Sequence, residues 1–213
     1  MIAIAGGKGG AGKTTTTLGL ARALARTDRP VLAVDADRDM PNLHALAGVP
    51  RTPSIAAVER NSERGSDPEP AGVAHEDSNV SGVRVLPAPT DADALDAAAL
   101  SRLRQSSRRV LLDCPAGAGP DAAAPLREAD ATLVVSLPTP QSLRDAAKTA
   151  AMARALDTEV VGAVVTRTET PPEGVERLLN TDRVFGVPDG GESPLASRTV
   201  CRSFRRLVAA LPG

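Results

Sequence analysis

The sequence predicts a single α/β domain in which a mostly parallel, twisted sheet carries helices on both of its faces. Three observations predict it. The 213 residues are enough for one domain with a sizeable core and few for two. Short apolar runs alternate with helical segments, and a glycine-rich segment directly follows the first apolar run. Because no linker or internal repeat divides the chain, we expect one domain over residues 1–213.

The predicted strands are short runs rich in Val, Ile and Leu. Most of them are continuously apolar, which is typical of strands buried on both faces of a parallel sheet. We expect strands at residues 2–5, 31–34, 83–86, 110–112, 132–136, 160–165 and 184–187. Helical patterns occupy residues 14–26, 96–105, 141–156, 173–180 and 194–210. Residues 59–82 are rich in Glu, Ser, Asp, Pro and Gly, so we expect a long surface excursion there.

Composition excludes several classes of protein. The formal net charge of −1 gives no overall field that would attract nucleic acid or an anionic membrane, so such contacts need a local patch. With two Phe and no Tyr or Trp, a base-stacking surface for nucleic acid is not expected. The two cysteines, Cys114 and Cys201, exclude a disulfide framework and a four-thiolate metal site within one chain. We see no signal-peptide pattern and no membrane-spanning apolar run, and we expect a cytoplasmic protein.

The glycine-rich segment after the first strand fits the phosphate-loop pattern G-x-x-x-x-G-K-[ST]. Glycines let backbone N–H groups wrap around a phosphate, and the helix that follows adds the positive end of its dipole. Lys13 would neutralise the β- and γ-phosphates, and the Thr14 hydroxyl is a ligand for Mg²⁺. The alternative is a glycine-rich turn with a surface lysine, which the flanking strand and helix disfavour. The segment consists of Gly7, Lys8, Gly9, Gly10, Ala11, Gly12, Lys13 and Thr14.

A second lysine in the same loop makes the pattern more specific. Residues Lys8 to Thr15 read K-G-G-A-G-K-T-T, which resembles the deviant Walker A motif of the MinD/ParA family of P-loop ATPases. The resemblance implies a P-loop NTPase fold, ATP and Mg²⁺ as cofactors, slow ATP hydrolysis with Lys8 and Lys13 as catalytic residues, and an ATP-dependent homodimer. In that family the early lysine reaches across the dimer to the partner's nucleotide, like an arginine finger. Alternatively, Lys8 is an ordinary solvated charge of the loop.

Aspartates follow two of the predicted strands. Asp35, Asp37 and Asp39 follow the second apolar run, and Asp113 follows the run at 110–112. The carboxyl ends of parallel strands share one edge of a sheet, so we expect these carboxylates beside the phosphate loop. The segments resemble switch I and the D-x-P-A-G Walker B segment of the same family. This implies that Asp37 is catalytic and orients the attacking water, and that Thr14, Asp113 and the outer-shell Asp35 belong to the metal site. Asp39 receives no role, and helix or turn capping is the alternative for all of these aspartates.

The remaining site residues are implied by a weaker part of the resemblance. Thr166 and Arg167 stand where family members often carry Asn-Arg or Thr-Arg beside the base, and Pro188 and Asp189 resemble the loop that closes over the nucleotide. Together with Thr15, they would complete the nucleotide site. Thr166 offers one hydroxyl where Asn offers a bidentate amide, so both adenine and guanine stay open.

The last helical pattern is amphipathic and basic. We expect its apolar stripe to pack on the sheet. Attachment to a membrane surface and contact with DNA phosphates are the alternatives, because its other faces carry arginines. The stripe consists of Val200, Phe204, Leu207, Val208 and Leu211, and the arginines are Arg198, Arg202, Arg205 and Arg206.

The resemblance implies an ATP-hydrolysing dimerisation switch that positions or partitions a cellular cargo, with an unidentified activator or cargo protein as partner. The second lysine together with D-x-P-A-G favours this function. The alternatives are a metabolic P-loop enzyme, such as a cobyrinate-type ATP-dependent amidase or ligase, and an ATPase similar to the iron–sulfur carriers. A cluster carrier needs paired cysteines near a dimer axis, and Cys114 and Cys201 lack that spacing.

Overall fold

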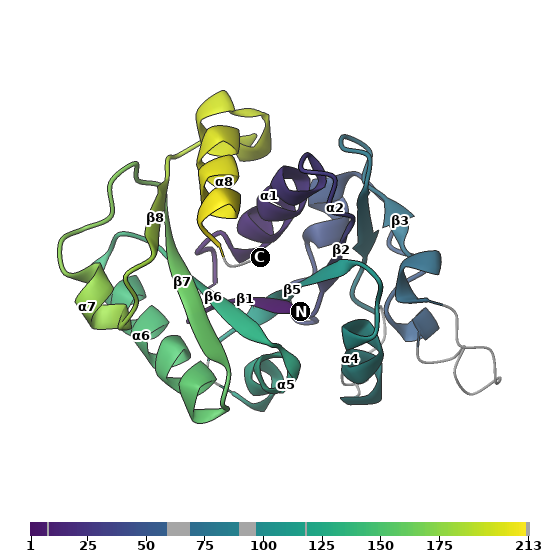
Figure 1. The fold of residues 1–213 in the computed structure, drawn as a ribbon, viewed down its shortest axis with the longest axis horizontal. Coiled ribbons are helices and arrows are strands. Elements are labelled where there is room, and N and C mark those ends of the chain that lie inside the picture. Colours follow the sequence, from purple (N-terminus) through teal and green to yellow (C-terminus); the bar gives the residue numbers. More distant parts are fainter. Residues whose placement is uncertain (8, 59–68, 90–96, 118, 212–213) are drawn as a thin grey trace.

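One mostly parallel sheet forms the centre of the molecule (Figure 1). The computed structural model describes residues 1–7, 9–58, 69–89, 97–117 and 119–211. Its eight strands lie in the order β3-β4-β2-β5-β1-β6-β7-β8, and among them only the β3–β4 pair is antiparallel. The strands are β1 (Ile2–Gly6), β2 (Val31–Asp35), β3 (His75–Glu76), β4 (Val83–Leu86), β5 (Arg109–Ala116), β6 (Ala131–Ser136), β7 (Glu159–Thr166) and β8 (Val184–Val187). The predicted fold class is confirmed.

Helices cover both faces of this sheet (Figure 1). One face carries α1 (Lys13–Ala25), α2 (Leu43–Ala47) and α8 (Arg198–Ala210). The opposite face carries α4 (Ala97–Arg104), α5 (Pro120–Glu128), α6 (Pro140–Ala155) and α7 (Val175–Leu179). Two short 3₁₀ turns, Pro70–Gly72 and Pro194–Ala196, lie in the connections. None of the described helices is long and apolar enough to cross a membrane.

The strands supply core residues on both faces because their side chains alternate between the faces. On β1, Ile2 and Ile4 pack into the core beneath α1 and α8, whereas Ala3 and Ala5 pack into the core on the other face. β1 is therefore buried on both faces, with its large side chains on one face of the sheet and its small ones on the other.

Helix α8 packs against the molecule through its apolar stripe, as expected. Val200, Phe204 and Leu207 are buried, and α8 contacts α1 and β8. The ring of Phe204 lies on α1 at Gly19, where an added β-carbon would be 2.3 Å from ring atom Cε2. The stripe is therefore part of the core of the described protein, and its arginines remain on the outside.

Three elements differ from the sequence prediction. Residues 59–68 lie outside the described structure, but residues 69–82 are not a plain surface excursion, because β3 extends the sheet and Asp77 is buried. Helix α5 was not predicted, since Pro125 and a run of alanines hide its apolar face. Helix α2 was not predicted either, because five residues are too few for a period to be recognised.

Candidate functional site

The P-loop, residues 7–14, connects the end of β1 to the start of α1. Two of its glycines are required by the geometry. At Gly7 an added β-carbon would lie 2.5 Å from the carbonyl oxygen of Asp145 in α6. Gly12 has a φ of 89°, in the left-handed region where glycine is least strained. The loop is therefore held close to α6 and turns sharply into α1.

Lys13 is the first residue of α1 and is only 7% exposed. It forms no ion pair with any carboxylate of the described residues. A buried ammonium group is costly unless a negative charge accompanies it. The N-terminus of a helix also favours an anion. The position of Lys13 therefore fits an anionic ligand held in the P-loop.

Two carboxylates lie on neighbouring strands beside this lysine. Asp35 at the end of β2 pairs in register with Asp113 of β5. Asp113 is 1% exposed, and the Thr17 hydroxyl of α1 donates to its Oδ1 at 3.4 Å. Asp35 accepts backbone N–H groups on both oxygens, from Asp37 and from Leu43, each at 3.1 Å. Asp35 thus fixes the loop that leads from β2 into α2.

Burial raises the pKa values of both carboxyl groups. For Asp35 the pKa rises to about 8, chiefly because of burial and then because of the neighbouring Asp113 charge. For Asp113 the pKa rises to about 7, again through burial, although the Thr14 hydroxyl and the Lys13 ammonium oppose the rise. A cation at this edge of the sheet would favour the charged forms of both groups.

The chemistry of these side chains fits Mg²⁺. Asp113 Oδ2 is buried and, by distance and angle, has no hydrogen-bond partner among the described residues. Such an oxygen is available to a cation or to one of its water ligands. The described residues contain no cluster of three metal-binding His, Cys, Asp or Glu side chains. Mg²⁺ commonly keeps waters and takes phosphate oxygens besides one or two protein ligands, so no larger cluster is needed.

A cavity of about 470 Å³ opens above the P-loop. It brings together Lys13, Thr14, Thr15, Asp37 and Arg167 from three separate parts of the chain. Asp37 is half-buried, and its Oδ1 accepts the backbone N–H of Met40 at 3.1 Å. The sequence analysis gave no role to five further residues that line this cavity: Asp39, Met40, Asn42, Leu46 and Ala116.

A smaller cavity of about 110 Å³ adjoins the P-loop on the side of β7 and β8. Thr166, Arg167, Pro188 and Asp189 line it, together with Gly12 and Thr15, so the predicted base-site residues do lie together. The Thr166 hydroxyl donates to the backbone oxygens of Ala11 at 2.8 Å and of Ser136 at 3.2 Å. In this arrangement Thr166 ties β7 to the P-loop.

Arg167 stands between the two cavities and has a strained backbone. Its φ of 58° is uncommon for a residue with a side chain. Its guanidinium donates to the backbone oxygen of Gly10 at 3.5 Å. This contact places a positive charge beside the P-loop, where the predicted nucleotide site lies.

Two predicted features need separate mention. Lys8 lies outside the described residues, so its role remains a prediction from the sequence. Cys114 is fully buried behind Asp113, burial raises the pKa of its thiol, and the thiol donates to the Leu112 carbonyl. A buried neutral thiol is a poor cluster ligand, so the structure gives no support to the iron–sulfur alternative.

Comparison with known proteins agrees with this geometry. Residues 2–189 match the CobQ/CobB/MinD/ParA nucleotide-binding domain. The chain belongs to this family. It is 31% identical over 196 residues to the septum site-determining protein MinD of Synechocystis, covering 88% of this chain and 71% of that protein.

Two solved structures of MinD proteins share the fold. The cell division ATPase MinD of Pyrococcus furiosus superposes with a TM-score of 0.80 at 27% identity, over 98% of this chain and 96% of that one. MinD of Pyrococcus horikoshii, solved in complex with Mg-ADP, gives a TM-score of 0.78 at 25% identity, over 97% and 93%. This chain is therefore a MinD/ParA-type P-loop domain, as its P-loop predicts.

Proposed function

We propose that this chain binds ATP with Mg²⁺ and hydrolyses ATP slowly, as a switch whose ATP-bound form is a homodimer. The observation that carries the proposal is the buried Lys13, which begins α1 and has no ion pair with a described carboxylate. The β- and γ-phosphates of ATP would supply the direct ion pairs that no described carboxylate forms with Lys13. The Mg-ADP complex of the Pyrococcus horikoshii relative supports the same ligand here.

The cavity residues divide the work of hydrolysis. Asp37 orients a water in line with the γ-phosphate, and Lys13 offsets the charge that develops on the transferred group. A bond forms from the water oxygen to the γ-phosphorus as the bond to the β–γ bridging oxygen breaks. ADP and inorganic phosphate leave, and the proton passes to phosphate or solvent. Thr14 and Asp113 would hold Mg²⁺, which would supply positive charge against the repulsion among the phosphate oxygens.

The role of the switch is the positioning or partitioning of a cargo. The likeness to proteins named for septum-site determination and cell division supports this role. A partner protein that activates hydrolysis or serves as the cargo belongs to the proposal.

Titration calorimetry tests the nucleotide site. Lys13→Ala removes the buried charge, so we expect ATP·Mg²⁺ affinity to fall by at least about tenfold. Lys148→Ala is the matched control, because Lys148 is exposed on α6 and pairs with Asp145. GTP in parallel measures base preference. Equal ATP affinity in the Lys13→Ala and Lys148→Ala proteins would reject the site.

A further inference from the structure

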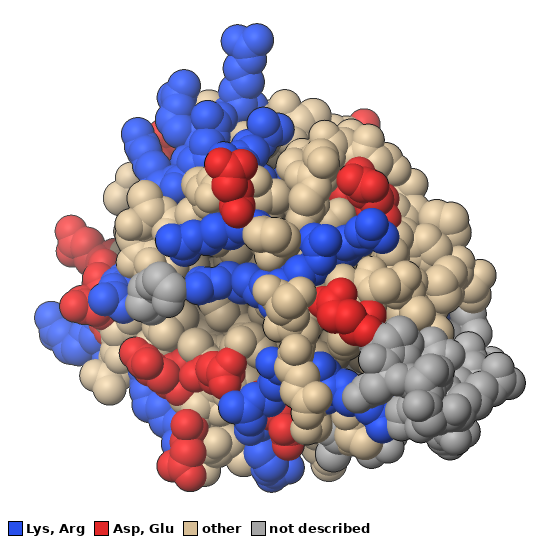
Figure 2. Space-filling model, turned by 45° about the vertical axis from the view of Figure 1, so that its right-hand side comes forward, with Lys and Arg blue, Asp and Glu red and all other residues tan. Residues whose placement is uncertain are grey.

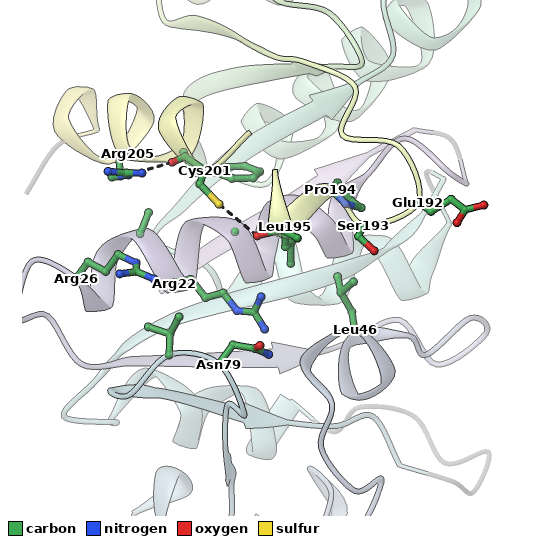
Figure 3. Close-up of a pocket in the computed structure, with 15 residues that line it drawn as sticks. Arg22, Arg26, Leu46, Asn79, Glu192, Ser193, Pro194, Leu195, Cys201 and Arg205 are labelled. Carbon is green, nitrogen blue, oxygen red and sulfur yellow. Dashed lines mark hydrogen bonds between the residues drawn. The ribbon is translucent and has the colours of Figure 1, made fainter. Parts of the chain in front are cut away.

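A groove of about 370 Å³ lies outside the nucleotide cavities, between α1, α8, the turn Pro194–Ala196 and the loop after β3. We call it the α1–α8 groove (Figure 3). Its floor is apolar and includes Ala23, Phe204 and Val80. Glycine at position 19 leaves room for the Phe204 ring to lie against α1. An apolar floor of this size is typical of a surface that receives one or two side chains of a ligand.

Hydrogen bonds fix the walls of the groove before any ligand arrives. Arg22 of α1 donates to both oxygens of the buried Asp77, at 2.8 and 3.1 Å, and Asp77 also accepts the backbone N–H groups of Asn79 and Val80. On the other side, the Cys201 thiol donates to the Leu195 carbonyl at 3.2 Å. The groove is therefore preformed, which lowers the free-energy cost of binding.

Charge is distributed unevenly along the groove. Arg26 and Arg205 lie at one end and Glu192 at the other (Figure 3). Both arginines are exposed, and neither forms an ion pair with a carboxylate of the described chain. Lys and Arg side chains also gather over the upper part of the face in Figure 2. Carboxylates on a partner would complement this end of the groove.

The groove shares walls with both nucleotide cavities. Leu46 of α2 lines the groove and also the cavity above the P-loop. Pro194 and Phe204 line the groove and also the smaller cavity beside β8. A ligand that moves α2 or the loop after β8 therefore changes the shape of the groove. Such shared walls couple two sites when one ligand binds the two shapes unequally.

We infer that the α1–α8 groove docks a segment of a partner protein, an apolar stretch with carboxylates at one end. The carboxylates meet Arg26 and Arg205, and the apolar side chains lie over Phe204. The affinity of the groove for this segment differs between the ATP-bound and ADP-bound states. This dependence on nucleotide rests on the proposed function, whereas the docking itself does not.

Selection from a phage-displayed library of random peptides on the nucleotide-free protein tests the inference. The most enriched peptide is synthesised with a fluorescent label, and its binding is measured by anisotropy. We expect it to combine large apolar residues with Asp or Glu. Arg26→Glu/Arg205→Glu should weaken binding by about tenfold or more. Arg127→Glu/Arg177→Glu is the control, because it makes the same charge change at exposed positions on α5 and α7.

Several results would overturn the inference. They are the absence of enrichment, enriched peptides without carboxylates, and equal weakening by the two double variants. Nucleotide-free self-association that only Arg26→Glu/Arg205→Glu abolishes would identify a second copy of this chain as the occupant. ATP binding is measured on the same variants and should be unchanged. If the proposed ATPase function were wrong, these proteins would not bind ATP but would still bind the peptide. Equal peptide affinity with ATP and ADP in a protein that binds both would reject the coupling.

Discussion

Asp37 is the carboxylate whose position best suits water orientation. Asp35 is committed to two backbone N–H groups, and Asp113 is buried beneath Lys13 and Thr17, whereas Asp37 lines the phosphate cavity and is half-buried. Asp37→Ala should lower the single-turnover rate of ATP hydrolysis by about 100-fold or more, because the nucleophile is no longer aligned. ATP affinity should stay within about threefold of wild type, since the ground-state phosphate contacts remain.

Two further variants separate water orientation from loop structure. Asp37→Asn keeps an oxygen that can accept the Met40 N–H, so its loop should be intact and its hydrolysis still slow. Asp39→Ala changes an exposed carboxylate of the same cavity and should hydrolyse ATP at nearly the wild-type rate. A slow Asp39→Ala protein beside a fast Asp37→Ala protein would assign the water to Asp39 instead.

The raised pKa values of Asp35 and Asp113 make the stability of the nucleotide-free protein depend on pH. Between about pH 4 and the folded pKa values of about 7 and 8, the folded protein holds protons that the unfolded chain has released. The contribution of these two groups to stability is therefore fully present below that range and is lost as the pH rises through it. In magnesium-free urea unfolding, the free energy of unfolding should fall between about pH 5 and pH 8.

Asp113→Asn removes one of these two titrations, so its stability should fall less over the same pH interval. Each carboxyl group contributes a slope of at most about 1.4 kcal/mol per pH unit. Identical slopes in the variant and the wild-type protein would show that Asp113 titrates normally in the folded state.

Some features of the site could be predicted from the sequence, and others could not. The P-loop follows from the sequence because glycine, lysine and threonine at fixed spacing have a local geometric purpose. The contact of Thr166 with the Ala11 carbonyl could not be predicted, since it depends on how closely β7 approaches the P-loop. The ion pair of Arg22 with Asp77 was missed for a similar reason: 55 residues separate the partners, and the acidic residue lies in a segment of polar composition.

At the scale of elements, strands were easiest to predict from the sequence where both of their faces are buried. All seven predicted strands are present. Most are continuous apolar runs of strands buried on both faces, whereas the edge strand β8 is mostly half-buried. The edge strand β3 has two residues and one antiparallel partner, so it leaves no such run. Helix α5 carries Pro125 in its interior, which local propensity counts against a helix although Leu126 is fully buried.

The contact between α1 and α8 depends on the absence of a side chain at Gly19. Gly19→Ala should lower the free energy of unfolding by about 1–3 kcal/mol, because the new methyl group would overlap the Phe204 ring. In a Phe204→Ala background the overlap is gone. There Gly19→Ala should be neutral or stabilising by about 1 kcal/mol through helix propensity. Guanidinium unfolding of the four proteins measures the coupling, and additive effects would contradict the packing described here.

At the scale of the whole molecule, the two cavities and the α1–α8 groove share walls. Leu46 joins the groove to the P-loop side, and Phe204 joins it to the side of β8. One side chain of α2 and one of α8 therefore line both the groove and a nucleotide cavity. A domain of this kind is suited to report which nucleotide it holds, provided that the ATP and ADP forms differ in assembly.

The second lysine of the P-loop is the residue on which assembly should depend. Lys13 would already serve the phosphates within one chain, and a second ammonium in the same pocket would cost free energy through repulsion. The pair becomes favourable if Lys8 offsets charge on the nucleotide of a second copy, since two triphosphates then face each other. ATP·Mg²⁺ should therefore promote dimerisation and ADP should not.

Light scattering of the slowly hydrolysing Asp37→Ala protein decides the role of Lys8. With ATP·Mg²⁺ we expect a dimer, and with ADP a monomer. Lys8→Ala/Asp37→Ala should bind ATP and stay monomeric, because each nucleotide loses its counter-charge from the opposite chain. Lys148→Ala/Asp37→Ala removes an exposed lysine from α6 and should still dimerise. If the dimer persisted without Lys8, or if Asp37→Ala stayed monomeric with ATP bound, Lys8 would be an ordinary loop charge and the switch would need another basis.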